Sequence, residues 1–212
     1  MMFHESQGDQ YLELCINRAK NKYLTWVEQF LDIISENVDI NKKHKLNDIG
    51  CNLGQFWKGL KRREMNNIDY NGFDFEEIYL KEAKNIFPEV SEKLNMINIA
   101  NDRPPQCDIS VCSATLEHLN YFQPGLDNIL KSTNKLVLLR TFMGETSLKS
   151  KFKRTGLMSY DIHQFLFHNI SYHFQREGFN SQIIQDRRTG SLLQKIENKF
   201  PRTFYIVLGV KK

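Results

Sequence analysis

Two acidic residues, each at the end of a predicted strand, flank a glycine turn in the first third of the chain. Asp48 ends one strand, and the turn after it runs through Gly50 and Gly54 into a helix that begins at Gln55. Glycines allow a tight turn and a close approach by a ligand, and the first N–H groups of the helix point into the turn. Asp74 ends the next strand, twenty residues after Gly54. An acidic side chain at that distance accepts hydrogen bonds from ribose hydroxyls.

The acidic residue in the turn restricts the chemistry of the ligand. The pattern Asp-x-Gly-x-x-x-Gly departs from the dinucleotide fingerprint Gly-x-Gly-x-x-Gly. A carboxylate beside a pyrophosphate would repel it, so a cationic or zwitterionic ligand suits this turn better. A cofactor with a ribose, no phosphates at the turn and a positive centre is indicated, and S-adenosyl-L-methionine has these properties.

Alternating strands and helices are predicted to position these residues. Strands at this spacing, separated by helices, indicate right-handed βαβ units and a parallel sheet. Strands are predicted at 45–48, 68–74, 96–99, 108–112, 135–140, 179–185 and 203–210. Helices are predicted over 9–38, where the less regular first part could be a separate helix, from 55, and over 76–86, 125–132 and 161–174. The last two strands need no helix between them, which predicts an antiparallel pair that completes the sheet.

The length and composition favour one cytoplasmic α/β domain over 1–212. It would comprise an N-terminal helical cover over 1–40, a core over 44–212 and, within the core, a lid over 142–160. The net charge of +4 permits an anionic ligand or nucleic acid but requires neither. The four cysteines show no short paired spacing, and no secretory leader or membrane-spanning apolar run is present, so we expect reduced thiols.

Beyond these patterns, the chain from about 45 to 211 resembles the class I S-adenosylmethionine-dependent methyltransferases of the small-molecule type (methyltransferase type 11/12-like). The turn is similar to the family's Asp-x-Gly-x-Gly-x-Gly, with Asn52 at the middle glycine. This departure is tolerable if Asn52 adopts the left-handed conformation, which asparagine does more readily than most residues. Further matching segments are Cys112–Leu119, which contains Leu-Glu-His-Leu, and His163–Phe165 with Glu177–Phe179. The resemblance implies a doubly wound, Rossmann-like, seven-stranded mixed sheet.

The same resemblance assigns roles to individual residues. The residues implied to bind the cofactor are Asp48, Gly50, Cys51, Asn52, Gly54, Asp74, Phe75, Asn98, Ile99 and Ser113. For Asp74 the alternative is a cap of the following helix. His118 and His163 are candidate general bases, with local packing as the alternative for each. Metal-dependent members carry Asp-Asn after the fifth strand; because Arg140-Thr141 stands here, we expect no metal.

The predicted function is methyl transfer to a small-molecule acceptor that could be anionic, most readily at an oxygen of a sugar, quinone or other biosynthetic intermediate. RNA or protein methylation is an alternative, favoured by the basic residues Lys149, Lys151, Lys153 and Arg154. The Pro-Pro segment of amide and adenine methylating members is absent after the fourth strand, where Ser113–Leu116 stands. A non-catalytic binding or partner subunit is a third reading, which Asn52 keeps open. The sequence indicates neither the oligomeric state nor the acceptor.

Overall fold

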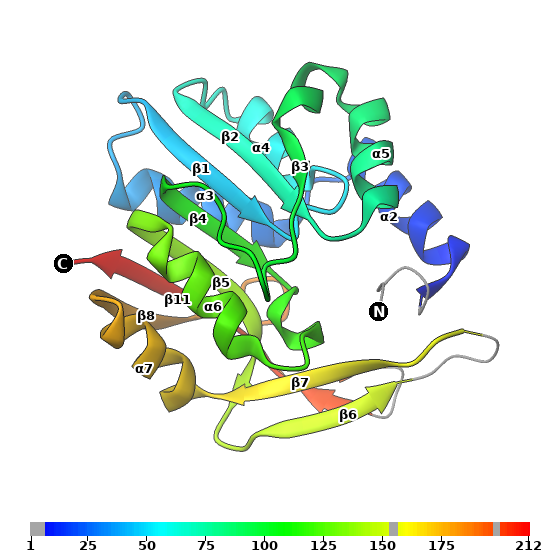
Figure 1. The fold of residues 1–212 in the computed structure, drawn as a ribbon, viewed down its shortest axis with the longest axis vertical. Helices are drawn as coiled ribbons and strands as arrows, with labels where there is room; N and C mark the ends of the chain where they lie inside the picture. The colour runs from blue at the N-terminus through cyan, green and yellow to red at the C-terminus, as the bar shows by residue number, and fades with distance from the viewer. Residues whose placement is uncertain (1–6, 153–156, 197–199) are drawn as a thin grey trace.

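The fold is built on one mixed sheet of nine strands in the described residues, two more than predicted, of which seven form a continuous path (Figure 1). The computed structural model describes residues 7–152, 157–196 and 200–212. The strand order is β3-β2-β1-β4-β5-β11-β8, and β11 alone runs antiparallel to both of its neighbours. This confirms the predicted doubly wound mixed sheet with an antiparallel C-terminal pair. The strands are β1 (His44–Ile49), β2 (Ile68–Asp74), β3 (Leu94–Met96), β4 (Cys107–Ser113), β5 (Thr133–Gly144), β8 (Phe179–Gln185) and β11 (Phe204–Lys211).

Helices cover both faces of this sheet. On one face, α3 and α4 pack on the strands; on the other lie α6 and α7 (Figure 1). The N-terminal helix α2 packs instead on Leu53 of the glycine turn and Tyr79 of α5. The α-helices are α2 (Asp9–Asn21), α3 (Thr25–Asn37), α4 (Gln55–Arg62), α5 (Glu77–Ile86), α6 (Phe122–Lys131) and α7 (Phe167–Arg176), and short 3-10 helices span Pro88–Lys93 (η1) and Leu116–His118 (η2).

The apolar central strands explain why the sheet is covered on both faces. In β5, Leu136 and Leu138 enter the core beneath α3 and α4, whereas Val137 and Leu139 enter the core beneath α6 and α7. Successive side chains of a strand point to opposite faces, so a continuous apolar run needs helices on both sides. All four of these leucine and valine side chains are essentially buried. The strand ends are therefore fixed by a rigid core, and the loops that follow them carry the candidate site.

The segment over 142–174 differs most from its prediction. Part of the expected lid is β-structure: β5 continues to Gly144, and β6 (Leu148–Phe152) pairs antiparallel with β7 (Tyr160–Leu166). Residues 153–156 of the lid lie outside the described residues. The helix predicted from Asp161 begins at Phe167, because Ile162 packs in a buried cluster with Phe142 and Phe152. That tertiary cluster favours an extended strand over 160–166.

Three smaller differences concern element ends. The helical stretch predicted over 9–38 is two helices, broken at residues 22–24, in line with the alternative of a separate first helix. The third strand lies over 94–96 instead of 96–99, so Asn98 and Ile99 follow it in a turn. A short hairpin of β9 (Gln194–Ile196) and β10 (Phe200–Arg202) stands between β8 and β11. Over the described residues, no helix combines the length and apolar character needed to cross a membrane.

Candidate cofactor site

The turn between β1 and α4 holds three residues in the left-handed conformation. The φ angles are 73° at Gly50, 49° at Asn52 and 76° at Gly54. Asn52 therefore meets the condition under which the departure from the glycine pattern is tolerable. Its side-chain oxygen accepts a hydrogen bond from Nε2 of Gln55 at 3.2 Å, which holds the turn against the start of the helix. Asparagine thus replaces the middle glycine without changing the backbone path that a glycine would give.

Asp74 ties this turn to the end of β2. One carboxylate oxygen accepts the N–H of Asn52 at 2.8 Å and the other accepts the N–H of Glu76 at 3.0 Å. The second bond is local, but Asp74 does not cap α5, because the N-cap residue is Glu76 and it has no side-chain cap hydrogen bond. Each carboxylate oxygen can accept a further bond, so these contacts leave capacity for ribose hydroxyls. Burial raises the pKa of Asp74 to about 6, against the lowering effect of its backbone hydrogen bonds.

Asp48 lies inside the protein rather than at the surface of the turn. Its side chain is 4% exposed, and one oxygen accepts the hydroxyl of Tyr70 at 2.9 Å. Burial and, to a smaller degree, the charge of Asp74 raise its pKa to about 7, against the lowering effect of the Tyr70 hydrogen bond. Cys51 is buried beside these groups, with only its backbone in the turn. The side chains of Asp48 and Cys51 therefore support the turn from inside the protein. The sequence pattern, in contrast, suggested that the Asp48 carboxylate faces the ligand.

The segment after β4 closes the site from the side of the neighbouring strand. A Cβ atom on Gly50 would lie 2.0 Å from Oγ1 of Thr115, so only glycine fits there. Ser113 ends β4 and Ala114 follows with φ 57°, a conformation that L-residues rarely adopt. Such backbone strain concentrates at functional sites. Sequence reasoning identified Ser113 but missed Ala114 and Thr115, because neither residue type signals a left-handed backbone or a contact across strands.

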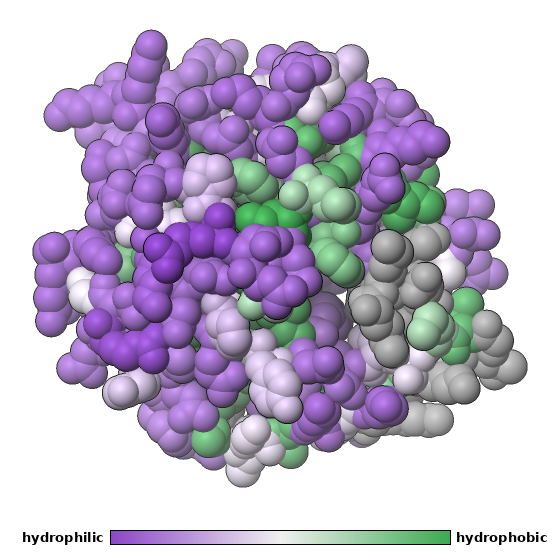
Figure 2. Space-filling view, viewed as in Figure 1, coloured by the Kyte–Doolittle hydropathy of each residue, from purple (hydrophilic) through white to green (hydrophobic). Residues whose placement is uncertain are grey.

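The other side of the turn presents apolar surface. Phe75 and Met96, at the ends of β2 and β3, are 39% and 67% exposed. Figure 2 shows a hydrophobic area on an otherwise largely hydrophilic face, over the C-terminal ends of the strands. Asn98 is half-buried in a turn in which its side-chain oxygen accepts the N–H of Ala100. Ile99 points into the core, so only its backbone could meet a ligand.

The two candidate histidines lie on neighbouring elements, His118 at the end of η2 and His163 in β7. Nδ1 of His118 lies 3.4 Å from the carbonyl oxygen of Asp161, and its ring packs edge-on against Tyr160. Burial lowers the pKa of His118 to about 4, so its imidazole is neutral at neutral pH. Burial and the charge of Lys149 lower the pKa of His163 as well. Both rings can therefore accept a proton only as weak bases.

Helix α2 covers the turn from above. Tyr11 and Cys15 lie one helical turn apart and hydrogen-bond to each other, and the Cys15 thiol also contacts the side chain of Asn52. Burial raises the pKa of Cys15, as it does for the other three cysteines. All four are buried free thiols, as predicted. Within the described part of the chain, no group of three His, Cys, Asp or Glu side chains could hold a metal ion.

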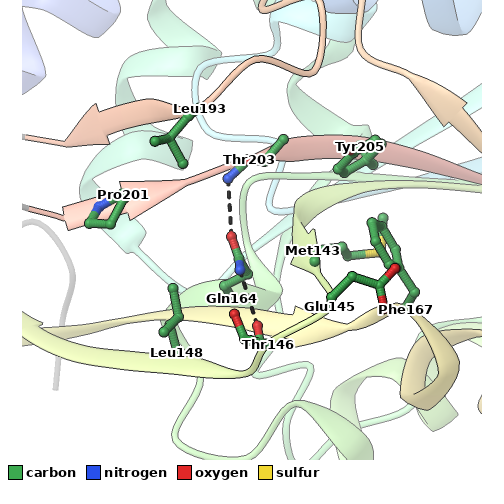
Figure 3. Close-up of a pocket in the computed structure, with 11 residues that line it drawn as sticks. Met143, Glu145, Thr146, Leu148, Gln164, Phe167, Leu193, Pro201, Thr203 and Tyr205 are labelled. Atoms are coloured by element: carbon green, nitrogen blue, oxygen red, sulfur yellow. Dashed lines mark hydrogen bonds between the residues drawn. The ribbon is translucent and has the colours of Figure 1, made fainter.

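A separate cavity of about 450 Å³ lies beyond β5 and contains none of the predicted site residues (Figure 3). Gln164 spans it, donating to the carbonyl of Thr146 at 3.1 Å and accepting the N–H of Thr203 at 3.2 Å. Phe167 and Tyr205 line its other end. Gln164 is thus satisfied by groups of the cavity itself, and the candidate cofactor residues lie at the turn, not in this cavity.

Comparison with known proteins places this geometry on a known fold. No family model and no curated protein matches the sequence. A S-adenosylmethionine-dependent methyltransferase from Clostridium acetobutylicum has a TM-score of 0.65 over 96% of this chain and 99% of its own, at 12% identity. Magnesium protoporphyrin IX methyltransferase from Synechocystis, solved with bound SAH, has a TM-score of 0.67 over 99% and 97%, at 13% identity. A TehB-like S-adenosylmethionine-dependent methyltransferase from Corynebacterium glutamicum has 0.64 over 99% and 98%, at 16% identity.

The chain therefore has the class I S-adenosylmethionine-dependent methyltransferase fold, spanning nearly the whole length of these structures. The turn also fits such a cofactor chemically. Gly50 and Gly54 bring backbone close to the site, and Asp74 keeps acceptor capacity toward hydroxyl groups. The exposed ring of Phe75 offers an apolar surface to a base.

Proposed function

We propose that this protein is a cytoplasmic methyltransferase that uses S-adenosyl-L-methionine to methylate a small-molecule acceptor. The observation that carries the proposal is the turn of three left-handed residues joined through Asp74 to the end of β2. Two similar structures support a small acceptor: one methyltransferase acts on magnesium protoporphyrin IX, and one domain was solved with SAH and D-fucose. The four buried thiols suit a reducing compartment.

Each part of the site has a role in this proposal. The cofactor supplies a methyl group on a positively charged sulfur. The backbone of Gly50–Gly54 would hold its methionine end, and Asp74 would accept hydrogen bonds from its ribose hydroxyls. Phe75, Asn98 and the backbone of Ile99 would flank its base, and Ser113 stands across the turn. Asp48 would act indirectly, by fixing the turn through Tyr70.

The remaining task of the protein is to position the acceptor and, for a hydroxyl acceptor, to take a proton. Alignment of two bound reactants can supply roughly 7–11 kcal/mol of the barrier, so an amine acceptor needs no dedicated base. For a hydroxyl acceptor we propose His118 and His163 as proton acceptors, since both lie on the segments that follow β4 and β5. Their lowered pKa values limit them to weak base catalysis.

Calorimetric titration of S-adenosylmethionine and SAH tests the cofactor assignment. Wild-type protein should bind both ligands, and Asp74→Ala should weaken binding at least about tenfold, since a hydrogen bond to a charged group contributes roughly 1.5–3 kcal/mol. The control is Asp69→Ala. It removes a surface carboxylate of the same strand, one that pairs with Lys93, and this variant should bind both ligands as the wild type does. Asp74→Asn, which retains one acceptor oxygen, separates a binding loss from a folding defect. Absence of heat with the wild-type protein would refute the proposal.

A further inference from the structure

Three arginines from separate parts of the chain gather at the edge of the sheet where β5 and β8 end. Arg18 lies on α2, Arg140 near the C-terminal end of β5, and Arg188 in the turn after β8. Arg188 lies within electrostatic reach of both other guanidinium groups and of Tyr11. Like charges repel, so the fold brings these side chains together against their electrostatic preference.

The turn that carries Arg188 is firmly anchored. Asp186 is fully buried and accepts two hydrogen bonds from Arg140, at 2.9 and 3.2 Å. The same carboxylate accepts the N–H and the hydroxyl of Thr189, at 3.1 and 2.6 Å. On the other side, the N–H of Arg187 donates to Gln29 of α3 at 2.8 Å. Arg188 is thus held between anchors on both sides, with part of its side chain exposed to solvent.

Arg18 reaches the same region from above. Tyr11, Cys15 and Arg18 lie at helical positions i, i+4 and i+7, which places them on one face of α2. Cys15 on this face contacts Asn52 of the turn. The half-buried Arg18 therefore stands over the C-terminal ends of the strands, on the side that α2 turns toward the site.

The charges of this cluster are not balanced. Asp186 neutralises Arg140, but among the described residues no carboxylate forms an ion pair with Arg18 or Arg188. Neighbouring arginines on the outer surface are paired: Arg63 and Arg187 both bond to Asp32. Burial and the guanidinium groups of Arg140 and Arg18 lower the pKa of Arg188. Two positive charges are thus available to a ligand.

Resting on the proposed function, we propose that Arg18 and Arg188 bind an oxyanion, a carboxylate or a phosphate, of the methyl acceptor. Arginine binds both groups through paired N–H donors. The methionine end of the cofactor also carries a carboxylate, so position decides between the two sources. Arg140 and Asp186 anchor the cluster at β5, two strands from the glycine turn of β1, which at about 4.8 Å per strand is roughly 10 Å away. An acceptor beyond the cofactor fits that separation.

The test uses protein saturated with SAH and two probes, inorganic phosphate and malonate, titrated at constant ionic strength against chloride. One probe or both should bind to the wild type, which also identifies the preferred oxyanion. Each of Arg18→Gln and Arg188→Gln should weaken probe binding, and the double variant should weaken it at least about tenfold, the effect of losing charge-assisted bonds. Lys43→Gln removes an exposed charge at the opposite edge of the sheet and should leave probe binding unchanged.

Separate arms identify the source of the oxyanion and keep the two proposals apart. SAH affinity should change by less than about twofold in all variants. A tenfold change in affinity, by comparison, corresponds to about 1.4 kcal/mol. Loss of SAH affinity with unchanged probe binding would assign the arginines to the cofactor carboxylate and overturn the proposal, as would equal probe binding in all variants. If the wild type binds no SAH, the proposed function fails, while the same titrations on the protein alone still test the oxyanion site. Unfolding temperatures confirm that each variant is folded.

Discussion

The buried pair of Arg140 and Asp186 should be the most sensitive ionic contact in the protein. Arg140 is 2% exposed and Asp186 is fully buried, and the guanidinium also stacks on the ring of Phe204 at 3.8 Å. Asp186→Asn preserves the volume but leaves the guanidinium without a counter-charge. Breaking a buried pair in this way costs about 3–5 kcal/mol. For a chain of this length each kcal/mol lowers the unfolding temperature by about 2–4 °C, so we expect a fall of about 10 °C.

The pH dependence of this effect follows from the carboxyl group. Burial alone would raise the pKa of Asp186, but hydrogen bonds and charge from Arg140, with the bonds from Thr189, lower it below the usual value. A carboxyl with a lowered folded-state pKa stabilises the protein above its unfolded pKa and loses that contribution as the pH falls through the folded pKa. The stability difference between wild type and Asp186→Asn should therefore be full at neutral pH and shrink below about pH 4.

Urea unfolding followed by circular dichroism, repeated across pH, measures this difference. The matched control is Asp69→Asn, which removes the carboxylate of a surface pair with Lys93 in which both side chains are about half exposed. Such surface pairs contribute about 0–1 kcal/mol. A loss below about 1 kcal/mol in Asp186→Asn, equal to the control, would refute the view that this pair is electrostatically isolated from solvent.

Two further predictions concern the glycine turn. Gly50→Ala should weaken SAH binding and destabilise the fold by at least about 1–2 kcal/mol, because the residue is left-handed and its Cβ would meet Thr115. Thr115→Ala in the same chain removes the closest contact and should restore part of the loss in a thermal-unfolding assay; no restoration would contradict the collision. Asn52→Gly should stay within about 1 kcal/mol of the wild type, whereas Asn52→Ala should be about 1 kcal/mol less stable than Asn52→Gly. Equal stability of the two Asn52 variants would argue against the left-handed backbone there.

The sheet and the turn could be predicted from sequence because both depend on local signals. Apolar runs set the central strands, and β8 spans Phe179–Gln185, the range predicted. The left-handed backbone at Asn52 followed from its residue type and from the two glycines around it. Glycine and asparagine tolerate a positive φ at low cost, so they mark such turns in a sequence.

The hairpin beyond β5 could not be predicted in this way because its pattern is ambiguous. Ile162 and Phe165 fit a helical face as well as a strand. The structure resolves the ambiguity through partners distant in sequence, since β7 pairs with β6 and Ile162 packs on Phe142. The ion pair of Arg140 with Asp186, 46 residues later, likewise joins residues that are distant in sequence. Neither residue carries a local signal of the other, so the arginine cluster emerges only in the fold.

Several features that cost stability collect at one edge of the sheet, and this argues that the edge is functional. The carboxyls of Asp48 and Asp74 are buried with raised pKa values at the ends of β1 and β2. Ala114 follows β4 with a strained backbone, and Arg188 stands without a carboxylate partner among the described residues. Packing alone would select against each of these features, because each lowers stability. Under the proposed function, the buried carboxyls lie toward β1, where the cofactor would bind, and Arg188 lies toward β5, where an anionic acceptor would bind.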